Sequence, residues 1–256
     1  MVKIIDTTPD SIHKYGMCGY KNLKNEGYKR KIDWIKQHYK KGMKYKILFS
    51  EDDGAIGGIE YLPGEFAWRS VETKGFMFIH CIYILSRKYK EQGYGINLLN
   101  ECIKDAKMLN MNGVAVVTRK GSFMQGNEIF IKTGFEIVDK AEPDFELLVK
   151  KFNSEVLNPK FKEFSVNLLK KYSNGLYIIT SSQCPYAIKS VTDITKIVEE
   201  KYKIKVNIIE LQNYKEAQDT PCAFGIFCII HNEKVIADHP ISSRRFCNIM
   251  EKRLNL

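Results

Sequence analysis

The chain has 256 residues, which is long for one small domain and suits two modest ones. Its hydrophobic content of 44% is ordinary for a globular protein, and without an apolar run of 18 or more residues we expect no transmembrane helix. Seven cysteines lack a repeating spacing and form no Cys-x-x-Cys pair, so neither a disulfide framework nor a structural metal site is predicted.

The N-terminal part of the chain is basic and contributes to a net charge of +10. Residues 1–6 contain no signal-peptide core, which predicts a cytoplasmic protein. Residues 21–46 alternate lysine with apolar residues at helical spacing, which predicts an amphipathic helix with a solvated basic face. No nucleic-acid motif accompanies this charge, so we favour attraction of an anionic cofactor over nucleic-acid binding.

A strand, a turn with two glycines and a helix follow in the first half of the chain. Residues 55–61 read as a hairpin strand and residues 76–85 as a buried strand, while apolar residues from Ile96 to Ala106 have helical spacing. The turn between the second strand and the helix is Lys90, Glu91, Gln92, Gly93, Tyr94 and Gly95. Glycines let the backbone approach a ligand, and N–H groups at a helix N-terminus attract phosphate. The turn therefore predicts a phosphate-holding loop.

A further predicted strand and a further predicted helix follow. Residues 114–118 form a β-branched run that suits a buried strand. Residues 127–135 predict a helix that ends at Gly134, with Phe135 as the apolar residue after the cap. We therefore expect a mixed α/β (α+β) domain.

The turn and the Gly134–Phe135 pair resemble motifs of the GNAT acetyltransferases, whose cofactor loop is Arg/Gln-x-x-Gly-x-Gly/Ala. Lys90 departs from this pattern. The resemblance implies a mixed central sheet flanked by helices, with acetyl-CoA as the donor and no metal. It also implies that the amides of Leu85 and Ser86 hold the pantetheine arm, while residues 90–95 hold the pyrophosphate.

The resemblance leaves the proton-handling groups open. Many GNAT enzymes protonate the leaving thiolate with a tyrosine four residues before the Gly-Phe pair, where this chain has Phe130. Tyr83, Ser122 or a water is then the candidate acid. Glu60 and His80 are the candidate bases for the incoming amine.

A second unit with a different element order follows residue 150. Residues 161–171 predict a helix, and the elements after Gly175 predict a strand (176–180), a helix (185–201) and a strand (205–210). A loop with Pro221, two hairpin strands (223–230 and 234–237) and a helix capped at Ser242 or Ser243 complete it. This βαβ-ββα order resembles the thioredoxin fold.

Cys184 lies just before the first helix of this unit and is followed by Pro185. A helix N-terminus stabilises a thiolate, so Cys184 is a candidate reactive residue. The resemblance places Pro221 where thioredoxin-like folds have a cis-proline, with Cys222 beside it as an irregular partner for Cys184. Ala187 stands in the position of the second, resolving cysteine, so a dithiol cycle between those two positions is impossible.

The two predicted units together resemble the YoaP-like group of GNAT proteins. The resemblance implies a GNAT domain at residues 1–150, a linker helix region at 151–174 and a thioredoxin-like domain at 175–256. The leading hypothesis is an N-acetyltransferase that acts on a small-molecule or peptide amine. Two alternatives stay open: a thiol-binding or redox protein acting through Cys184 with a CoA sensor, and a non-catalytic acyl-CoA-binding module. The acceptor and the oligomeric state are not predicted.

Overall fold

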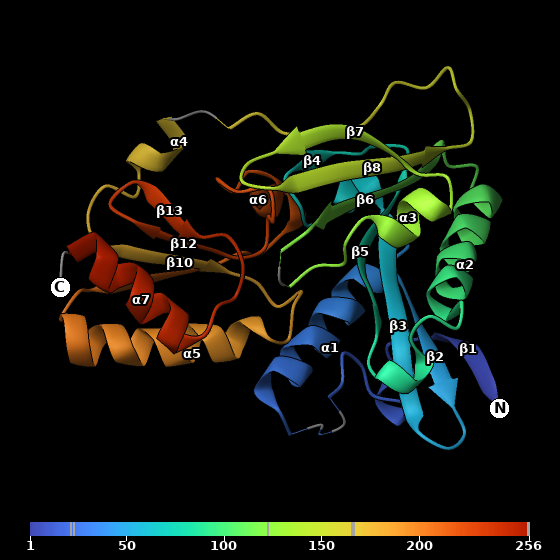
Figure 1. Cartoon of the computed structure of the whole chain (residues 1–256), viewed down its shortest axis with the longest axis horizontal. Helices are drawn as coiled ribbons and strands as arrows, with labels where there is room; N and C mark the ends of the chain where they lie inside the picture. Colours follow the sequence, from blue (N-terminus) through green and yellow to red (C-terminus); the bar gives the residue numbers. More distant parts are fainter. Residues whose placement is uncertain (21, 23, 122, 165–166, 255–256) are drawn as a thin grey trace. The chain divides into compact units, whose positions relative to one another are not determined.

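The computed structural model describes residues 1–20, 22, 24–121, 123–164 and 167–254 (Figure 1). It consists of two compact units. The first is Met1–Ala67 with Val71–Phe161, and the second is Trp68–Ser70 with Lys162–Leu256.

The first unit contains a seven-stranded sheet in the order β1-β2-β3-β5-β6-β8-β7. Its strands are β1 (Val2–Thr7), β2 (Lys44–Ser50), β3 (Gly54–Pro63), β5 (Met77–Ile84), β6 (Gly113–Arg119), β7 (Glu136–Ala141) and β8 (Phe145–Lys151). Neighbouring strands are antiparallel except β5 and β6, which are parallel. A separate two-stranded sheet pairs β4 (Val71–Glu72) with β9 (Lys160–Phe161).

Helices cover both faces of this sheet. They are η1 (Ile12–Lys14), α1 (Glu26–Tyr39), η2 (Gly64–Phe66), η3 (Arg87–Tyr89), α2 (Tyr94–Met108) and α3 (Glu128–Lys132). Figure 1 shows α1 and α2 on either side of β2 and β3. Leu98, Leu99, Cys102 and Ala106 of α2 pack into the core with β3, β5 and β6, as the helical spacing predicts. Ile96, by contrast, is exposed.

The prediction for the basic segment 21–46 is partly wrong. The helix is only α1, which Asn25 caps by accepting a hydrogen bond from the Tyr28 N–H, and Lys44 begins β2. Lys31 and Lys46 are buried rather than solvated, because each pairs with a carboxylate: Lys31 with Glu60 and Lys46 with Glu101, 2.7 Å away. Lys21 and Leu23 lie outside the described residues.

The second unit contains a four-stranded sheet in the order β11-β10-β12-β13. Its strands are β10 (Leu176–Thr180), β11 (Val206–Glu210), β12 (Cys228–His231) and β13 (Lys234–Ala237). Its helices are α4 (Asn167–Lys170), α5 (Ala187–Ile197), the π-helical η4 (Val198–Tyr202), α6 (Tyr214–Gln218) and α7 (Ser243–Leu254). β10 is parallel to β11 and antiparallel to β12, which is antiparallel to β13. This is the predicted βαβ-ββα order, so the predicted fold class is confirmed.

Several local predictions for this unit differ from the structure. Phe161 lies in β9 rather than in a helix, and the segment from Ala223 to Phe227 precedes β12 instead of extending it. The cis peptide bond of the described chain is Glu142–Pro143, so Pro221 follows a trans bond, contrary to the expectation for a thioredoxin-like fold. Ser242 does cap α7, because its hydroxyl accepts a hydrogen bond from the Arg245 N–H at 3.3 Å.

Candidate functional site

The parallel strands β5 and β6 diverge partway along their length. Their ladder contains only three residue pairs and ends at Ile79 and Val116. Beyond that point β5 continues to Ile84 on its β3 side, and β6 continues to Arg119 on its β8 side. At about 3.3 Å per residue, the five residues after Ile79 leave an open strand edge of about 17 Å. We call this opening between the two strands the wedge.

The backbone of the strand end determines which peptide groups face the wedge. The Leu85 N–H donates to the Ile56 carbonyl oxygen at 2.8 Å, so it points toward β3 and is engaged within the sheet. Peptide groups in a strand point alternately to its two edges. The Ile84 groups therefore face the wedge, and so does the N–H of Ser86, which is itself extended, whereas the Ser86 carbonyl oxygen accepts from the Tyr89 N–H at 3.1 Å. The expectation that the Leu85 amide holds a ligand therefore does not fit the structure, and the role expected for the Ser86 amide stays a prediction.

Side-chain contacts to Ser50 and Asp53 anchor the turn after β5. Tyr89 of η3 is buried, and its hydroxyl donates to the carboxylate of Asp53 and lies 3.1 Å from the Ser50 hydroxyl. Lys88 forms an ion pair of 2.8 Å with the same carboxylate. The anchored aromatic ring holds the loop that follows in one place relative to the sheet.

The loop itself presents unbonded amides. Glu91 has φ +63° and Gly93 has φ +81°, and alternating left-handed residues turn successive N–H groups toward one side. Among the described residues, none accepts a hydrogen bond from the backbone N–H groups of residues 91–96. Gly93 is the N-cap of α2, so the helix dipole also points at this space. Unbonded amides at a helix N-terminus are suited to binding an anion.

The two glycines of the loop serve different purposes. A Cβ placed on Gly93 meets no atom within 4 Å, so a side chain there would occupy the open space in front of the amides. A Cβ on Gly95 would lie 2.7 Å from Cδ1 of Ile129 in α3. Gly95 is therefore explained by close packing of α2 against α3. Lys90, Glu91 and Gln92 are exposed around the loop, and Tyr94 and Gly95 are partly exposed.

On the α1 face of the sheet, the candidate bases Glu60 and His80 meet Lys31 in a buried cluster. Glu60 forms an ion pair with Lys31 of α1, and Nδ1 of His80 lies 3.3 Å from Oε1 of Glu60. Burial raises the pKa of Glu60, but the charge of Lys31 and the contact with His80 outweigh burial and lower its pKa to about 2. Glu60 therefore remains a carboxylate and holds a proton too weakly to act as a good base.

Tyr83 lies further along β5 on the same face. Its hydroxyl accepts a hydrogen bond from the Cys18 N–H at 2.8 Å and lies 2.9 Å from the Tyr45 hydroxyl. The Cys18 thiol lies 3.3 Å from the same Tyr45 oxygen. Burial raises the pKa of Tyr83 well above its ordinary value, so the phenol keeps its proton. Sequence reasoning identified Tyr83 but missed Cys18 and Tyr45, which come from distant segments.

In α3, the position at which many GNAT enzymes have the tyrosine acid is occupied by Phe130. Phe130 is fully buried in the core and packs edge-on against Phe135, with ring centroids 5.5 Å apart. Gly134 has φ +82° and caps α3, which confirms the predicted glycine cap. Ser122, the other candidate acid, lies outside the described residues.

The cysteines of the second unit occupy two environments. Cys184 is partly exposed in the turn before α5, and its carbonyl oxygen accepts from the Ala187 N–H at 3.2 Å. The helix begins at Ala187, later than predicted. Cys222 is buried, its thiol donates to the Phe227 carbonyl oxygen at 3.4 Å, and it also contacts the buried Cys228.

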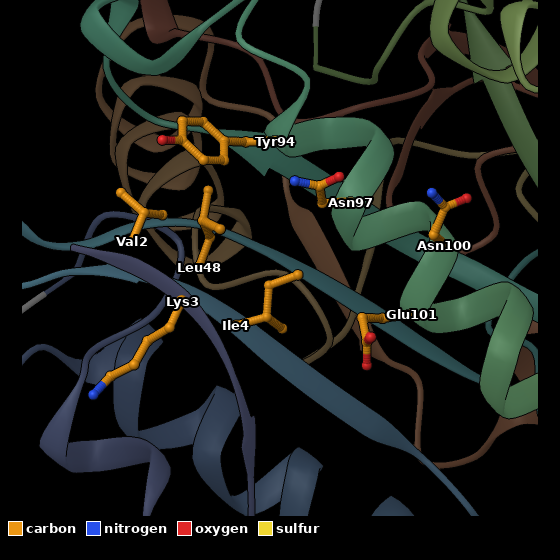
Figure 2. A pocket seen from close by; sticks show the side chains of 8 residues that line it. All are labelled: Val2, Lys3, Ile4, Leu48, Tyr94, Asn97, Asn100 and Glu101. Atoms are coloured by element: carbon orange, nitrogen blue, oxygen red, sulfur yellow. The ribbon is translucent and has the colours of Figure 1, made fainter.

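A separate cavity of about 390 Å³ lies between β1, β2 and the first turns of α2 (Figure 2). Val2, Ile4 and Leu48 form its apolar floor, while Tyr94 and Asn97 project from α2. β1 and β2 lie at one end of the sheet order, away from β5 and β6. The cavity is therefore distinct from the wedge.

The first unit combines a mixed sheet, diverging parallel strands and an amide-lined loop. The chain is similar to known proteins in its second unit and over its full length. Residues 206–248 match the model of the YoaP-like family. The whole chain is 28% identical to the "Uncharacterized N-acetyltransferase YoaP" of Bacillus subtilis strain 168, over 98% of each chain. The predicted resemblance to the YoaP-like group is thereby confirmed.

Solved structures also resemble part of the chain. A PaiA N-acetyltransferase from Thermoplasma acidophilum in complex with coenzyme A is 18% identical, with 59% of this chain and 99% of that one covered and a TM-score of 0.37. The GNAT protein YhbS from Escherichia coli in complex with CoA is 12% identical, with 63% and 90% covered and a TM-score of 0.42. Within the described part of the chain, no helix is long and apolar enough to cross a membrane. No group of three metal-ligating side chains is found among the same residues.

Proposed function

We propose that the chain is an acetyl-CoA-dependent N-acetyltransferase acting on a small-molecule or peptide amine. The observation that carries this proposal is the combination of the wedge between β5 and β6 with the unbonded amides of residues 91–96 at its mouth. An extended arm can add to a free strand edge, and a pyrophosphate can accept from amides at a helix N-terminus. The full-length relationship to a protein named as an N-acetyltransferase supports the same activity.

In this proposal, different residues bind different parts of acetyl-CoA. The amides of Glu91 to Gly95 hold the pyrophosphate, and Lys90 adds positive charge beside it. The wedge-facing groups of Ile84 and the N–H of Ser86 hold the pantetheine arm and polarise the thioester carbonyl. Bound in this way, acetyl-CoA supplies an activated acetyl group. The protein contributes positioning and hydrogen bonds to the developing oxyanion.

The amine approaches from the α1 face, where the polar candidates lie. His80 is a better base than Glu60, because Glu60 is held as a carboxylate with a pKa of about 2. Glu60 positions the imidazole through its 3.3 Å contact. Tyr83 keeps its proton and can donate a hydrogen bond to the substrate. Because acetyl-CoA is made in the cytoplasm, we also place the protein there.

For the second unit we propose a thioredoxin-like domain over residues 175–256, joined to the GNAT domain (1–150) by residues 151–174. The strand order and directions support this assignment, and the trans bond before Pro221 departs from it. A second candidate function follows from the partly exposed Cys184 before α5. In that alternative Cys184 binds or exchanges thiols, and the first unit senses CoA.

Calorimetry with acetyl-CoA and with CoA, followed by an amine panel monitored for free CoA thiol, tests the proposal. We expect binding of both nucleotides and amine-dependent thiol release. Binding without release for any amine would favour the non-catalytic acyl-CoA module. Absence of binding would refute the proposal. Activity that disappears in Cys184→Ser but does not depend on amine would favour the thiol alternative.

A further inference from the structure

The hydroxyl of Thr118 in β6 is buried without a hydrogen-bond partner. Thr118 is 0% exposed, and Oγ1 makes no hydrogen bond to any described residue. Nearly all buried polar atoms in proteins are paired, since an unpaired one loses its bonds to water without replacement. An unpaired hydroxyl in a strand otherwise made of well-packed residues therefore needs an explanation.

Thr118 lies at the edge of the wedge. The last residue of β6 that pairs with β5 is Val116, and Thr118 follows two residues later, about 7 Å along the strand. Its other neighbour is Glu146 of β8, directly opposite in the ladder. The hydroxyl is thus located where β6 has lost its partner on one side.

The face on which the hydroxyl lies can be read from the strand alternation. Val114 and Val116 belong to the core cluster that contains α2 and Phe130 of α3, so Thr118, two residues on, points to the same face. A hydrogen bond between Glu146 and Asn127 supports this placement of Thr118. The side chain of Glu146, which shares this face with Thr118, accepts a hydrogen bond of 2.7 Å from Asn127, the N-cap of α3.

This is also the face from which a donor would enter the wedge. The loop at residues 91–96 opens α2, and α2 covers the same face of β5 and β6. Phe130 of α3 packs there without a hydroxyl. Resting on the proposed function, we propose that Oγ1 of Thr118 donates a hydrogen bond to the thioester sulfur of acetyl-CoA. Thr118 is therefore a catalytic residue of the acetyl transfer.

Acetyl transfer exchanges a C–S bond for a C–N bond. The amine nitrogen attacks the acetyl carbon, a C–N bond forms and the C–S bond breaks, and its electron pair passes to sulfur. The Thr118 hydroxyl keeps its proton and stabilises the thiolate by the O–H···S contact. The proton lost by the amine goes to His80 or water, and coenzyme A takes one proton from solvent. A donor in a site of low dielectric stabilises the developing charge more than water does.

The test compares Thr118→Val, which keeps the shape and removes the hydroxyl, with Thr118→Ser, which keeps the hydroxyl. In the full chain, we expect Thr118→Val to lower kcat by about tenfold or more, as loss of a transition-state donor does, while KM for acetyl-CoA and CoA affinity stay within about twofold. Thr118→Ser should retain most of kcat.

Stability without any ligand gives an independent readout. Removing an unpaired buried hydroxyl should leave the unfolding midpoint of Thr118→Val unchanged or raise it. The matched control is Thr73→Val. Thr73 is also buried, but its hydroxyl donates to the Gly64 carbonyl oxygen at 3.0 Å, so this variant should unfold at a lower temperature with normal kcat.

The outcomes separate this inference from the proposed function. A wild-type protein that binds no CoA or releases no thiol refutes the proposed function. An active wild-type protein with equal kcat in Thr118→Val overturns the inference alone. A lowered midpoint in Thr118→Val, or equal losses of kcat in the Val and Ser variants, indicates a packing role and also overturns it. If Thr118→Val does not fold, Thr118→Ala provides the same comparison.

Discussion

Replacement of Gly93 by valine tests the anion-binding loop most directly. Gly93 has φ +81°, a conformation that β-branched residues rarely adopt. A left-handed L-residue costs about 1–2 kcal/mol. No steric clash adds to this cost, because a Cβ at this position meets no atom within 4 Å. The variant should therefore fold, with its free energy of unfolding reduced by about 1–2 kcal/mol.

The effect on binding should be separate from the effect on folding. The valine side chain occupies the open space in front of the loop amides, so a phosphate can no longer approach them. We expect CoA affinity to fall at least tenfold, or about 1.4 kcal/mol. Calorimetric titration with CoA measures this change, and denaturant unfolding measures stability on the same samples.

A second glycine provides the matched control. Gly42, in the turn between α1 and β2, has φ +85°, and its Cβ would lie 3.1 Å from Cγ of Pro63. Gly42→Val should lose at least as much stability, because the contact with Pro63 adds to the backbone cost, but should keep its CoA affinity. If folded Gly93→Val binds CoA as tightly as wild type does, the loop is not the phosphate site and the main support for the proposed function is lost.

Glu60, Phe130 and Cys184 provide three further tests. The lowered pKa of Glu60, about 2, corresponds to about 3 kcal/mol of stability above pH 4.5. This stability should disappear as the pH falls through 2, and the unfolding free energy of Glu60→Gln should lack the dependence between pH 5 and 2. Phe130→Tyr should lower the free energy of unfolding by about 1–3 kcal/mol, because the added hydroxyl is buried. Its turnover should stay the same or rise. A fall in turnover that exceeds the loss of folded protein would contradict this prediction. Limiting iodoacetamide at neutral pH should label Cys184 before Cys102 and Cys228, which are fully buried and whose pKa values burial raises. Mass spectrometry reads the labelling, and equal labelling of the three cysteines argues against a reactive second unit.

Local sequence patterns predicted much of the fold. The two-glycine turn, the strands on either side of it and the cap at Gly134 depend on neighbours a few residues away, and the structure contains all of them. The order of strands and helices in the second unit could be predicted for the same reason. Errors occurred where periodicity continues past the end of an element, as at Lys44, which begins β2 rather than ending a helix.

The site was predicted less completely, because its contacts join residues far apart in the sequence. Lys31 reads as one lysine of a basic helix, and only its packing against Glu60 shows that it is a buried partner. Leu85 lies at the predicted strand end, but the direction of its N–H depends on pairing with Ile56.

Residue type and short-range spacing were enough to predict the element order, the glycine turn at the start of a helix and the missing hydroxyl at Phe130. The three-dimensional structure was needed to locate where β5 and β6 separate, which amides remain unbonded, and the buried hydroxyl of Thr118 that has no partner at that separation. These features depend on strand register and on packing between distant segments, and no local pattern records them.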